Sequence, residues 1–387
     1  MTVSAQPGVV SFGIQAGKGE LATDFYRHRA VSVNYGPVQD PRVFPPEVGG
    51  VLTPTGAYKG GVFMAGGFTI MPRLQHYLGY LLLGLMGKVV TTPGAGVLNT
   101  HVFTFAADQS SLPWLSVRKK VPGATALWEI GLDNRITSAR FDFPQNGILS
   151  ARFDFLGREP DWTTPASEVY AGPYEDYPSV PVTCDVDGYL KLPNSYYSTA
   201  EVPITNLSVM MANNLTTPAQ EMIIGSPYPD DFAPLSRGAT IQAVLKYADP
   251  QLYLDIMTGA VAGTTWAPLP FTSNLDVIIK SPGYIPTTTT KYSLRVQAET
   301  VMWNVNGSPV LSGGDIVLLP LIGTVLEPTS GDYLSFTIVN DVPAYIDYTL
   351  SSASPSKSPS ASQSKSPSAS ASPSASLSPS RSASPSA

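Results

Sequence analysis

Histidine and cysteine, the side chains that most often hold metals or act as nucleophiles, are scarce in this sequence of 387 residues. The three histidines, His28, His76 and His101, share no metal-ligand spacing with one another or with Cys184, the single cysteine. We therefore expect structural or surface histidines and no metal site. A single cysteine also excludes an internal disulfide, so the fold does not depend on an oxidising compartment.

Two acidic clusters offer carboxylates. The run DVDG at Asp185–Gly188 begins like a calcium loop, but it lacks the glycine at loop position 6 and the closing acidic residue. It is better interpreted as a turn between strands. Asp230 and Asp231 are adjacent in the Pro-rich run PYPDDF, where such pairs are usually solvated turn residues; a glycosidase would need a partner carboxylate from elsewhere.

The local motifs of common enzyme classes are absent: the sequence contains no GxxxxGK[ST], no GxSxG and no HExxH. Six tyrosines between Tyr170 and Tyr197 could stack on sugars, but tyrosines in a Pro-rich connector more often pack onto neighbouring domains. We therefore predict that the protein is not an enzyme and uses no cofactor.

Charge and composition separate a body from a tail. The chain has a net charge of −6, and without the tail's Lys357, Lys365 and Arg381 residues 1–350 carry −9. An acidic body argues against a phosphate-gripping groove, because affinity for DNA comes mainly from Lys and Arg. From Ser352 every second residue is serine, with proline and alanine between, which predicts a disordered segment. The most apolar stretch, Tyr77–Met86, is about half the ~20 residues of a membrane span.

Short alternating apolar runs between Pro and Gly predict many strands and few helices. Two helices are expected. One is Met71–Gly87, with Pro72 at its first position and Gly87 at its end; the other is Asp249–Gly259, with Asp249 as its cap.

These helices also indicate an internal repeat. Pro72 and Pro250 are 178 residues apart, and each helix is followed by a Leu-Pro-aromatic run before a strand, at Leu112 and Leu269. The second offset is 157 residues, which indicates a longer helix and loop in the first copy. The order of elements occurs twice, and we predict a tandem duplication.

The hexapeptide SARFDF occurs at Ser138–Phe143 and again at Ser150–Phe155, on either side of a turn signal. We expect a hairpin with one apolar and one charged face. The predicted register sets Phe141 opposite Phe153, Arg140 opposite Asp154 and Asp142 opposite Arg152, so that the hairpin fixes its own pairing.

Several runs together resemble the tail tube proteins of tailed bacteriophages. They are GGVFMAGGFTIMPRLQHYLGYLLLGLMG, THVFTF from Thr100, LPWLSVRK from Leu112 and the NGILSARFDFLG hairpin. The second copy repeats the order more weakly, from NLSVMMANN at Asn206, and the resemblance spans roughly residues 25–350.

The resemblance implies a mainly β protein with short α-helices: two tandem antiparallel β-sandwich domains, each flanked by a helix, joining into a ring or tube β-barrel. The expected divisions are an N-terminal arm (1–24), a first domain (25–160), a Pro/Tyr-rich connector (161–178), a second domain (179–350) and the tail (351–387).

The same resemblance implies a structural protein of the virion tail, assembled in the host cytoplasm from stacked rings through which DNA passes without specific binding. Six such domains usually form a ring, so a duplicated chain would form a homotrimeric pseudo-hexamer, whereas a homohexamer would follow if the duplication is wrong. Tape-measure and tail completion proteins are the expected partners, and no membrane is involved.

The segment Gly36–Gly60 is Pro-rich and longer than compact domains usually tolerate in a loop, so we predict that it reaches a neighbouring subunit or ring. The predicted interface residues are Pro37, Asp40, Pro45, Pro46 and Tyr58. Two alternatives stay open: another virion protein, such as a distal tail or baseplate ring or a capsid decoration protein, and a carbohydrate-binding module with a Ser/Pro linker. The second is less favoured because a linker should join two domains and no export signal is evident.

Overall fold

The computed structural model describes residues 4–345, apart from 52, 76, 108–111, 146, 166–169, 171–180, 185–188, 192–203, 248–249 and 310–315. The predicted tail, and most of the predicted connector, lie outside these residues. Strands account for 53% and helices for 7% of the described residues, which confirms the mainly β prediction. The strands form a large antiparallel sheet system that is consistent with a β-sandwich and is not closed into a barrel.

The strands of the first half are β1 (Val9–Ile14), β2 (Tyr26–His28), β3 (Ala30–Val33), β4 (Gly36–Val43), β5 (Ala57–Ile70), β6 (Gly87–Pro93), β7 (Asn99–Phe105), β8 (Leu115–Val121), β9 (Leu127–Pro144), β10 (Ser150–Gly157) and β11 (Glu159–Asp161). Those of the second half are β12 (Tyr189–Lys191), β13 (Ile204–Leu215), β14 (Pro234–Lys246), β15 (Thr272–Tyr284), β16 (Lys291–Val305), β17 (Leu318–Val325) and β18 (Ser335–Asn340). The helices are α1 (Leu78–Met86), α2 (Pro218–Glu221) and α3 (Pro250–Thr258).

The first half consists of two sheets that share β9. In one sheet β1 pairs with β2 and β8, and β8 and β11 pair with the first part of β9. In the other, β3 and β4 pair with β5, β5 with β10, and β10 with the second part of β9. Strand β9 passes between the sheets at Asp133, whose φ of 52° interrupts the extended backbone. The Asp133 carboxylate accepts from the Gly19 amide at 2.6 Å and from Arg158 Nε at 2.7 Å.

The segment predicted as an N-terminal arm is part of the fold, because it contributes the buried strand β1.

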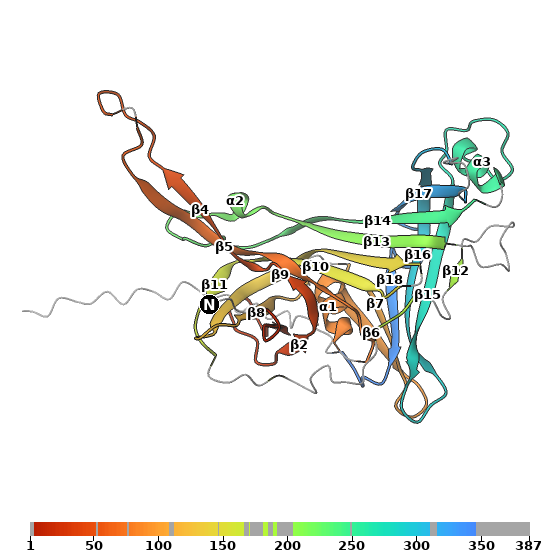
Figure 1. Ribbon diagram of the computed structural model, residues 1–387. Coiled ribbons are helices and arrows are strands. Elements are labelled where there is room, and N and C mark those ends of the chain that lie inside the picture. The colour runs from red at the N-terminus through yellow and green to blue at the C-terminus, as the bar shows by residue number, and fades with distance from the viewer. Residues whose placement is uncertain are drawn as a thin grey trace, which may run out of the picture. The chain divides into compact units, whose positions relative to one another are not determined.

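The strands of the second half belong to the larger of these two sheets. Strand β13 pairs with β14, β14 with β17, β17 with β16, and β16 also with β15 and β18. The two halves join where β9 pairs with β13 and where β7 pairs with β18, so hydrogen-bonded strands continue from one half into the other (Figure 1).

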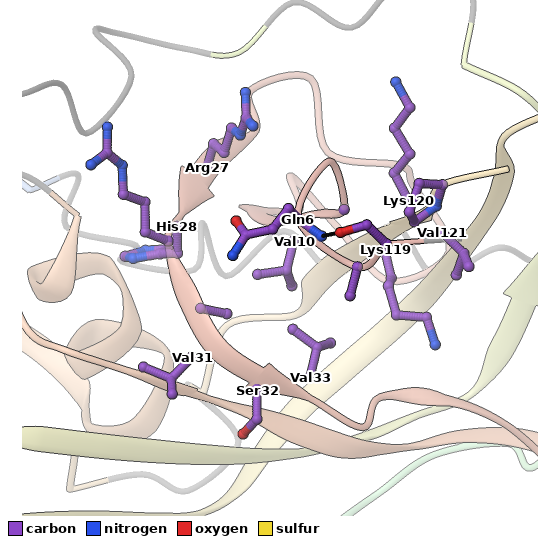
Figure 2. A pocket seen from close by; sticks show the side chains of 16 residues that line it. Gln6, Val10, Arg27, His28, Val31, Ser32, Val33, Lys119, Lys120 and Val121 are labelled. Carbon is purple, nitrogen blue, oxygen red and sulfur yellow. Dashed lines mark hydrogen bonds between the residues drawn. The ribbon is translucent and has the colours of Figure 1, made fainter. Parts of the chain in front are cut away.

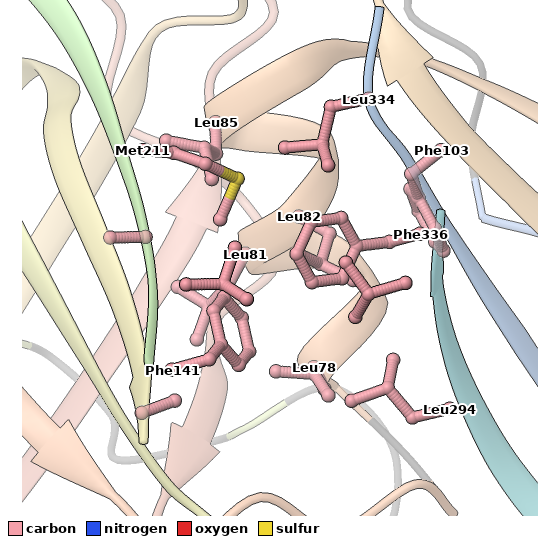
Figure 3. Close-up of a cluster of buried hydrophobic side chains, with 14 of the residues drawn as sticks. Leu78, Leu81, Leu82, Leu85, Phe103, Phe141, Met211, Leu294, Leu334 and Phe336 are labelled. Carbon is pink, nitrogen blue, oxygen red and sulfur yellow. The ribbon is translucent and has the colours of Figure 1, made fainter. Parts of the chain in front are cut away.

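Helix α1 fills the core at this junction, and all nine of its residues are buried. Figure 3 shows Leu81 and Leu85 beside Met211 of β13, and Leu82 beside Phe336 of β18. The predicted start of the helix was wrong: β5 continues to Ile70, and Pro72 precedes α1 by six residues. The predicted end at Gly87 is confirmed, because its φ of 86° allows the left-handed cap.

Helix α3 begins at Pro250 as predicted, while Asp249, its predicted cap, lies outside the described residues. Gly259 ends the helix with a φ of 78°, and its amide donates to the Asp255 carbonyl at 2.9 Å. Unlike α1, α3 is covered on one side only, since Leu254 and Met257 are 41% and 51% exposed.

The β9–β10 hairpin exists, but the predicted register is wrong. Arg152 lies opposite Arg140, Ala151 opposite Phe141, Phe153 opposite Ala139, Ser150 opposite Asp142 and Asp154 opposite Ser138. The difference is two residues, so the apolar and charged faces stay as predicted. Two contacts outside the hairpin hold its connecting loop: the Gln145 amide donates to Thr205 O and the Leu149 amide to Val182 O. The charges pair within each strand instead of across it.

The segment predicted as a long loop is largely a β-hairpin. Strand β4 pairs with β5 from Gly36–Ala65 to Val43–Ala57, and the hairpin extends away from the rest of the sheet (Figure 1). Its apolar residues Val43, Phe44 and Val51 are exposed, so the hairpin has no core of its own.

Candidate functional site

The side chains with potential chemistry do not form a reaction centre in the described part of the chain. His28 is buried and stacks on Phe12 with ring centroids 5.1 Å apart. His76 and Asp185–Gly188 lie outside the described residues. Lys18 Nζ lies 3.6 Å from Asp230 and 4.0 Å from Asp231, so these acids form an ion-pair cluster. Within the described ranges, no three His, Cys, Asp or Glu side chains are placed to hold a metal ion together.

His101 joins the two halves, a role that the sequence did not indicate. Its Nε2 lies 2.9 Å from Asn340 Oδ1, and its Nδ1 lies 2.9 Å from Thr91 Oγ1. Asn340 Nδ2 donates to the Leu74 carbonyl at 2.8 Å and to the Tyr345 hydroxyl at 2.9 Å. Burial lowers the pKa of His101, which favours the neutral imidazole that this network needs. The β7–β18 joint therefore contains a buried network of polar side chains.

Asn213 and Arg135 strengthen the other joint. Asn213 of β13 is buried and donates from Nδ2 to the Leu85 carbonyl at the end of α1, at 2.8 Å, and to Ile136 O at 3.1 Å. Arg135 of β9 donates from Nη1 to Phe232 O at 2.8 Å, and burial lowers its pKa. Both contacts hold the β13–β14 hairpin on the first half of the protein.

The edge of β3 borders a groove of about 840 Å³ between β3 and the end of β8. Figure 2 shows Val31, Ser32 and Val33 on its β3 side and Val121 on its β8 side. Val31 and Val33 are 61% and 37% exposed. The other lining residues include four cations, Arg27, Arg29, Lys119 and Lys120.

A second exposed apolar area lies at α3 and the loop that follows it. Trp266 and Leu269 are 76% and 73% exposed, and with Met257 they line a depression of about 450 Å³ beside the end of β16, at Asn304 and Val305. We call this area the α3 patch. Its members are Leu254, Met257, Trp266 and Leu269.

The predicted interface residues all lie on the β4–β5 hairpin. Pro37 is half-buried near its base, whereas Asp40, Pro45, Pro46 and Tyr58 are exposed. Tyr58 packs against Phe44 with ring centroids 5.5 Å apart. The structure brings these residues onto one extended element and leaves their role in assembly a prediction.

The exposed features are thus strand edges, an extended hairpin and apolar patches, which are typical of a structural β protein. In the described part of the chain, no helix is long and apolar enough to span a membrane. The sequence model of a family described as phage tail tube protein matches residues 37–284, more than half of the chain. The chain therefore belongs to the phage tail tube protein family, which is generally non-enzymatic and whose members are structural proteins of the virion tail that assemble with other tail components. No curated protein matches the sequence.

Proposed function

We propose that this chain assembles into stacked three-chain rings that form the tube of a phage tail, through which DNA passes. The observation that carries the proposal is the β9–β13 joint, in which seven residue pairs from Asn206–Pro144 to Ala212–Ser138 merge the two halves into one sheet. The same joint, formed between chains, would continue the sheet around a ring.

Matching strand connections support the duplication on which the three-chain ring depends. Strand β10 pairs with both β5 and β9, and β17 pairs with both β14 and β16. The irregularity between Ala30 and Ser32 in β3 has a counterpart between Ile204 and Asn206 in β13, 174 residues later. The β6–β7 hairpin has no counterpart after α3 among the described strands, which agrees with the shorter sequence offset beyond the helices. We infer tandem domains at 25–160 and 179–350.

This correspondence identifies the edges that would meet between chains. Residues 206–212 of β13, which pair with β9, correspond to residues 32–38 of β3 and β4. Strand β10 corresponds to β17, and within them Asp154 corresponds to Ile322. Asp154 lies opposite Ser138 of β9, and Ile322 lies opposite Asn304 of β16, so Asn304 corresponds to Ser138. The end of β16 from Asn304 therefore corresponds to the part of β9 that binds β13. Strand β15 accompanies β16 only as far as Met302. We infer that the end of β16 receives the β3–β4 edge of the next chain.

Exposure on the two surfaces supports the same pairing. Helix α1 is wholly buried because β13 and β18 cover it, whereas α3, at the corresponding position, exposes Met257. Val33 corresponds to Leu207, which is 3% exposed, yet Val33 is 37% exposed. The α3 patch of one chain and the β3 groove of the next would therefore cover each other, as their counterparts do within the chain.

Disulfide trapping tests the proposed edge pairing. In the correspondence above, Val38 of one chain lies opposite Asn304 of the next, as Ala212 lies opposite Ser138. Directly paired strand residues have Cα atoms about 4.5–5.5 Å apart, within the range that a disulfide spans. A Val38→Cys/Asn304→Cys chain in a Cys184→Ser background should give covalent species that end at three chains. The Asn304→Cys chain alone is the matched control and should give no such series.

The mass of the trapped rings decides between the candidate assemblies. Negative-stain images of porous rings with a scattering mass of three chains are expected. Rings of six chains would keep the tube and refute the pseudo-hexamer, whereas failure to cross-link in visible rings would refute the edge pairing alone.

A further inference from the structure

Three strands of the large sheet carry an arginine and an aspartate two residues apart, and those of β9 and β10 lie on the side of the sheet that faces away from the core. Arg140 Nε lies 2.8 Å from Asp142 Oδ1, and Arg152 Nη2 lies 2.7 Å from Asp154 Oδ1. The same arrangement occurs on β4, where Arg42 Nε lies 3.1 Å from an Asp40 oxygen. In each case the partner lies in the same strand, so the pairing does not depend on strand register.

In the β9–β10 hairpin the ion pairs within each strand offset an unfavourable arrangement of charges across the strands. Arg140 and Arg152 lie directly opposite each other, a like-charge arrangement that is unfavourable across strands. Two adjacent guanidinium groups also match the geometry of a phosphate, which arginine binds through parallel N–H donors. Their side chains are 47% and 39% exposed, so a polyanion could reach them. Asp142 accepts from Arg140 Nε, and Asp154 accepts from Arg152 Nε and Nη2, so each aspartate neutralises its arginine and occupies part of its donor set.

The opposite side of the same strands faces the core, where Phe141 and Phe153 are fully buried. The helix α1 lies on that side. If the large sheet closes into a ring around a channel wide enough for duplex DNA, helix α1 and the sheet that contains β1, β2, β8 and β11 must lie outside the ring. The surface bearing Arg140 and Arg152 then faces the channel.

We propose that Asp142 and Asp154 shield Arg140 and Arg152 from the DNA backbone, so that DNA moves along this channel surface without being held. The proposal rests on the proposed function for the position of the surface, but the shielding is a property of each chain. It gives the repeated hexapeptide SARFDF a function: each copy supplies one arginine together with its own neutralising aspartate.

The test uses the full chain with Asp142→Asn and Asp154→Asn, which keep side-chain size and an acceptor oxygen. Circular dichroism and thermal unfolding first establish that the variant is folded. Fluorescence anisotropy with a labelled DNA duplex in low salt should detect binding by the variant and none by the parent chain. The logarithm of the association constant should fall with the logarithm of salt concentration with a slope of about −2, since two arginines would each neutralise one phosphate.

The matched control carries the same two changes together with Arg140→Gln and Arg152→Gln, and it should not bind. Failure of the folded aspartate variant to bind, or binding by the control that equals it, would overturn the shielding. If the double aspartate variant does not fold, the single changes Asp142→Asn and Asp154→Asn provide the second measurement. Each should expose one arginine and give a smaller but measurable affinity, and folded single variants without affinity would count against the proposal.

Nuclease digestion of assembled tubes distinguishes the two proposals. DNA bound by tubes of the aspartate variant should be protected from nuclease if the surface faces the channel. Complete digestion would place it outside and overturn the channel assignment, while the tube itself would stand. A chain that binds DNA but forms no rings or tubes would contradict the proposed function and leave the shielding supported.

Discussion

Replacing Gly79 by alanine is expected to weaken the contact between α1 and the segment that follows β18. Gly79 is the second residue of α1, and a Cβ atom there would lie 2.2 Å from Tyr345 Cζ and 2.4 Å from its Cε1. The Tyr345 ring is 2% exposed and packs edge-on against His101, with centroids 4.6 Å apart. The ring cannot move aside without leaving the network of His101 and Asn340.

The expected magnitude is the difference between two opposing contributions. In an unhindered helix, alanine in place of glycine stabilises by about 0.5–1 kcal/mol. Overpacking a filled core costs about 1–3 kcal/mol, and displacing a buried aromatic ring loses a further ~1.5–3 kcal/mol. Steric conflict should therefore prevail, and the Gly79→Ala chain should lose about 1.5–5.5 kcal/mol of unfolding free energy.

The assay is chemical unfolding of four chains: the parent, Gly79→Ala, Tyr345→Ala and the double variant. Without the ring, the conflict disappears, so Gly79→Ala should change sign and stabilise the Tyr345→Ala chain by about 0.5–1 kcal/mol. Equal effects of Gly79→Ala with and without Tyr345 would refute the reasoning. A more stable Gly79→Ala single variant would do so as well.

Three further outcomes are expected. Because burial lowers the folded-state pKa of His101 below its unfolded value of 6.5, stability should be full above pH 6.5 and fall as the pH drops below it; unfolding of His101→Gln followed against pH should lack this contribution. Asn213→Ala should cost about 1–3 kcal/mol in thermal unfolding, because the buried Leu85 and Ile136 carbonyls lose a donor, whereas Asn214→Ala, on the exposed side of the same strand, should cost much less. Deleting residues 40–55 should leave the monomer folded, because residues 56–61 can close the Gln39–Val62 pair, and it should abolish tube formation; tubes of normal length in electron micrographs would contradict the predicted role of the hairpin.

Local sequence patterns determined the β-rich class, the C-terminal ends of α1 and α3, and the side of the SARFDF strands that faces the core. Alternation placed Phe141 and Phe153 in the core, and this depends only on the two-residue period of a strand. Gly87 and Gly259 marked the helix ends because each adopts a positive φ there. The sequence also predicts a repeated order of elements, since a Leu-Pro-aromatic run follows each helix, at Leu112 and Leu269.

Tertiary contacts decided what those patterns left open. The register of the SARFDF hairpin follows from β5 and β13 on its two sides and from a loop held by Thr205 and Val182, none of which adjoins it in sequence. The Gly36–Gly60 segment is a hairpin because β5 continues beyond the core and offers β4 a partner strand. His101 gained its role because β7 pairs with a strand more than 200 residues away, where Asn340 satisfies its ring nitrogen. Sequence periodicity determines which side of an element is apolar. The packed neighbours determine which strand it pairs with and in which register, because the pairing energies of many registers are similar until the surrounding core excludes all but one.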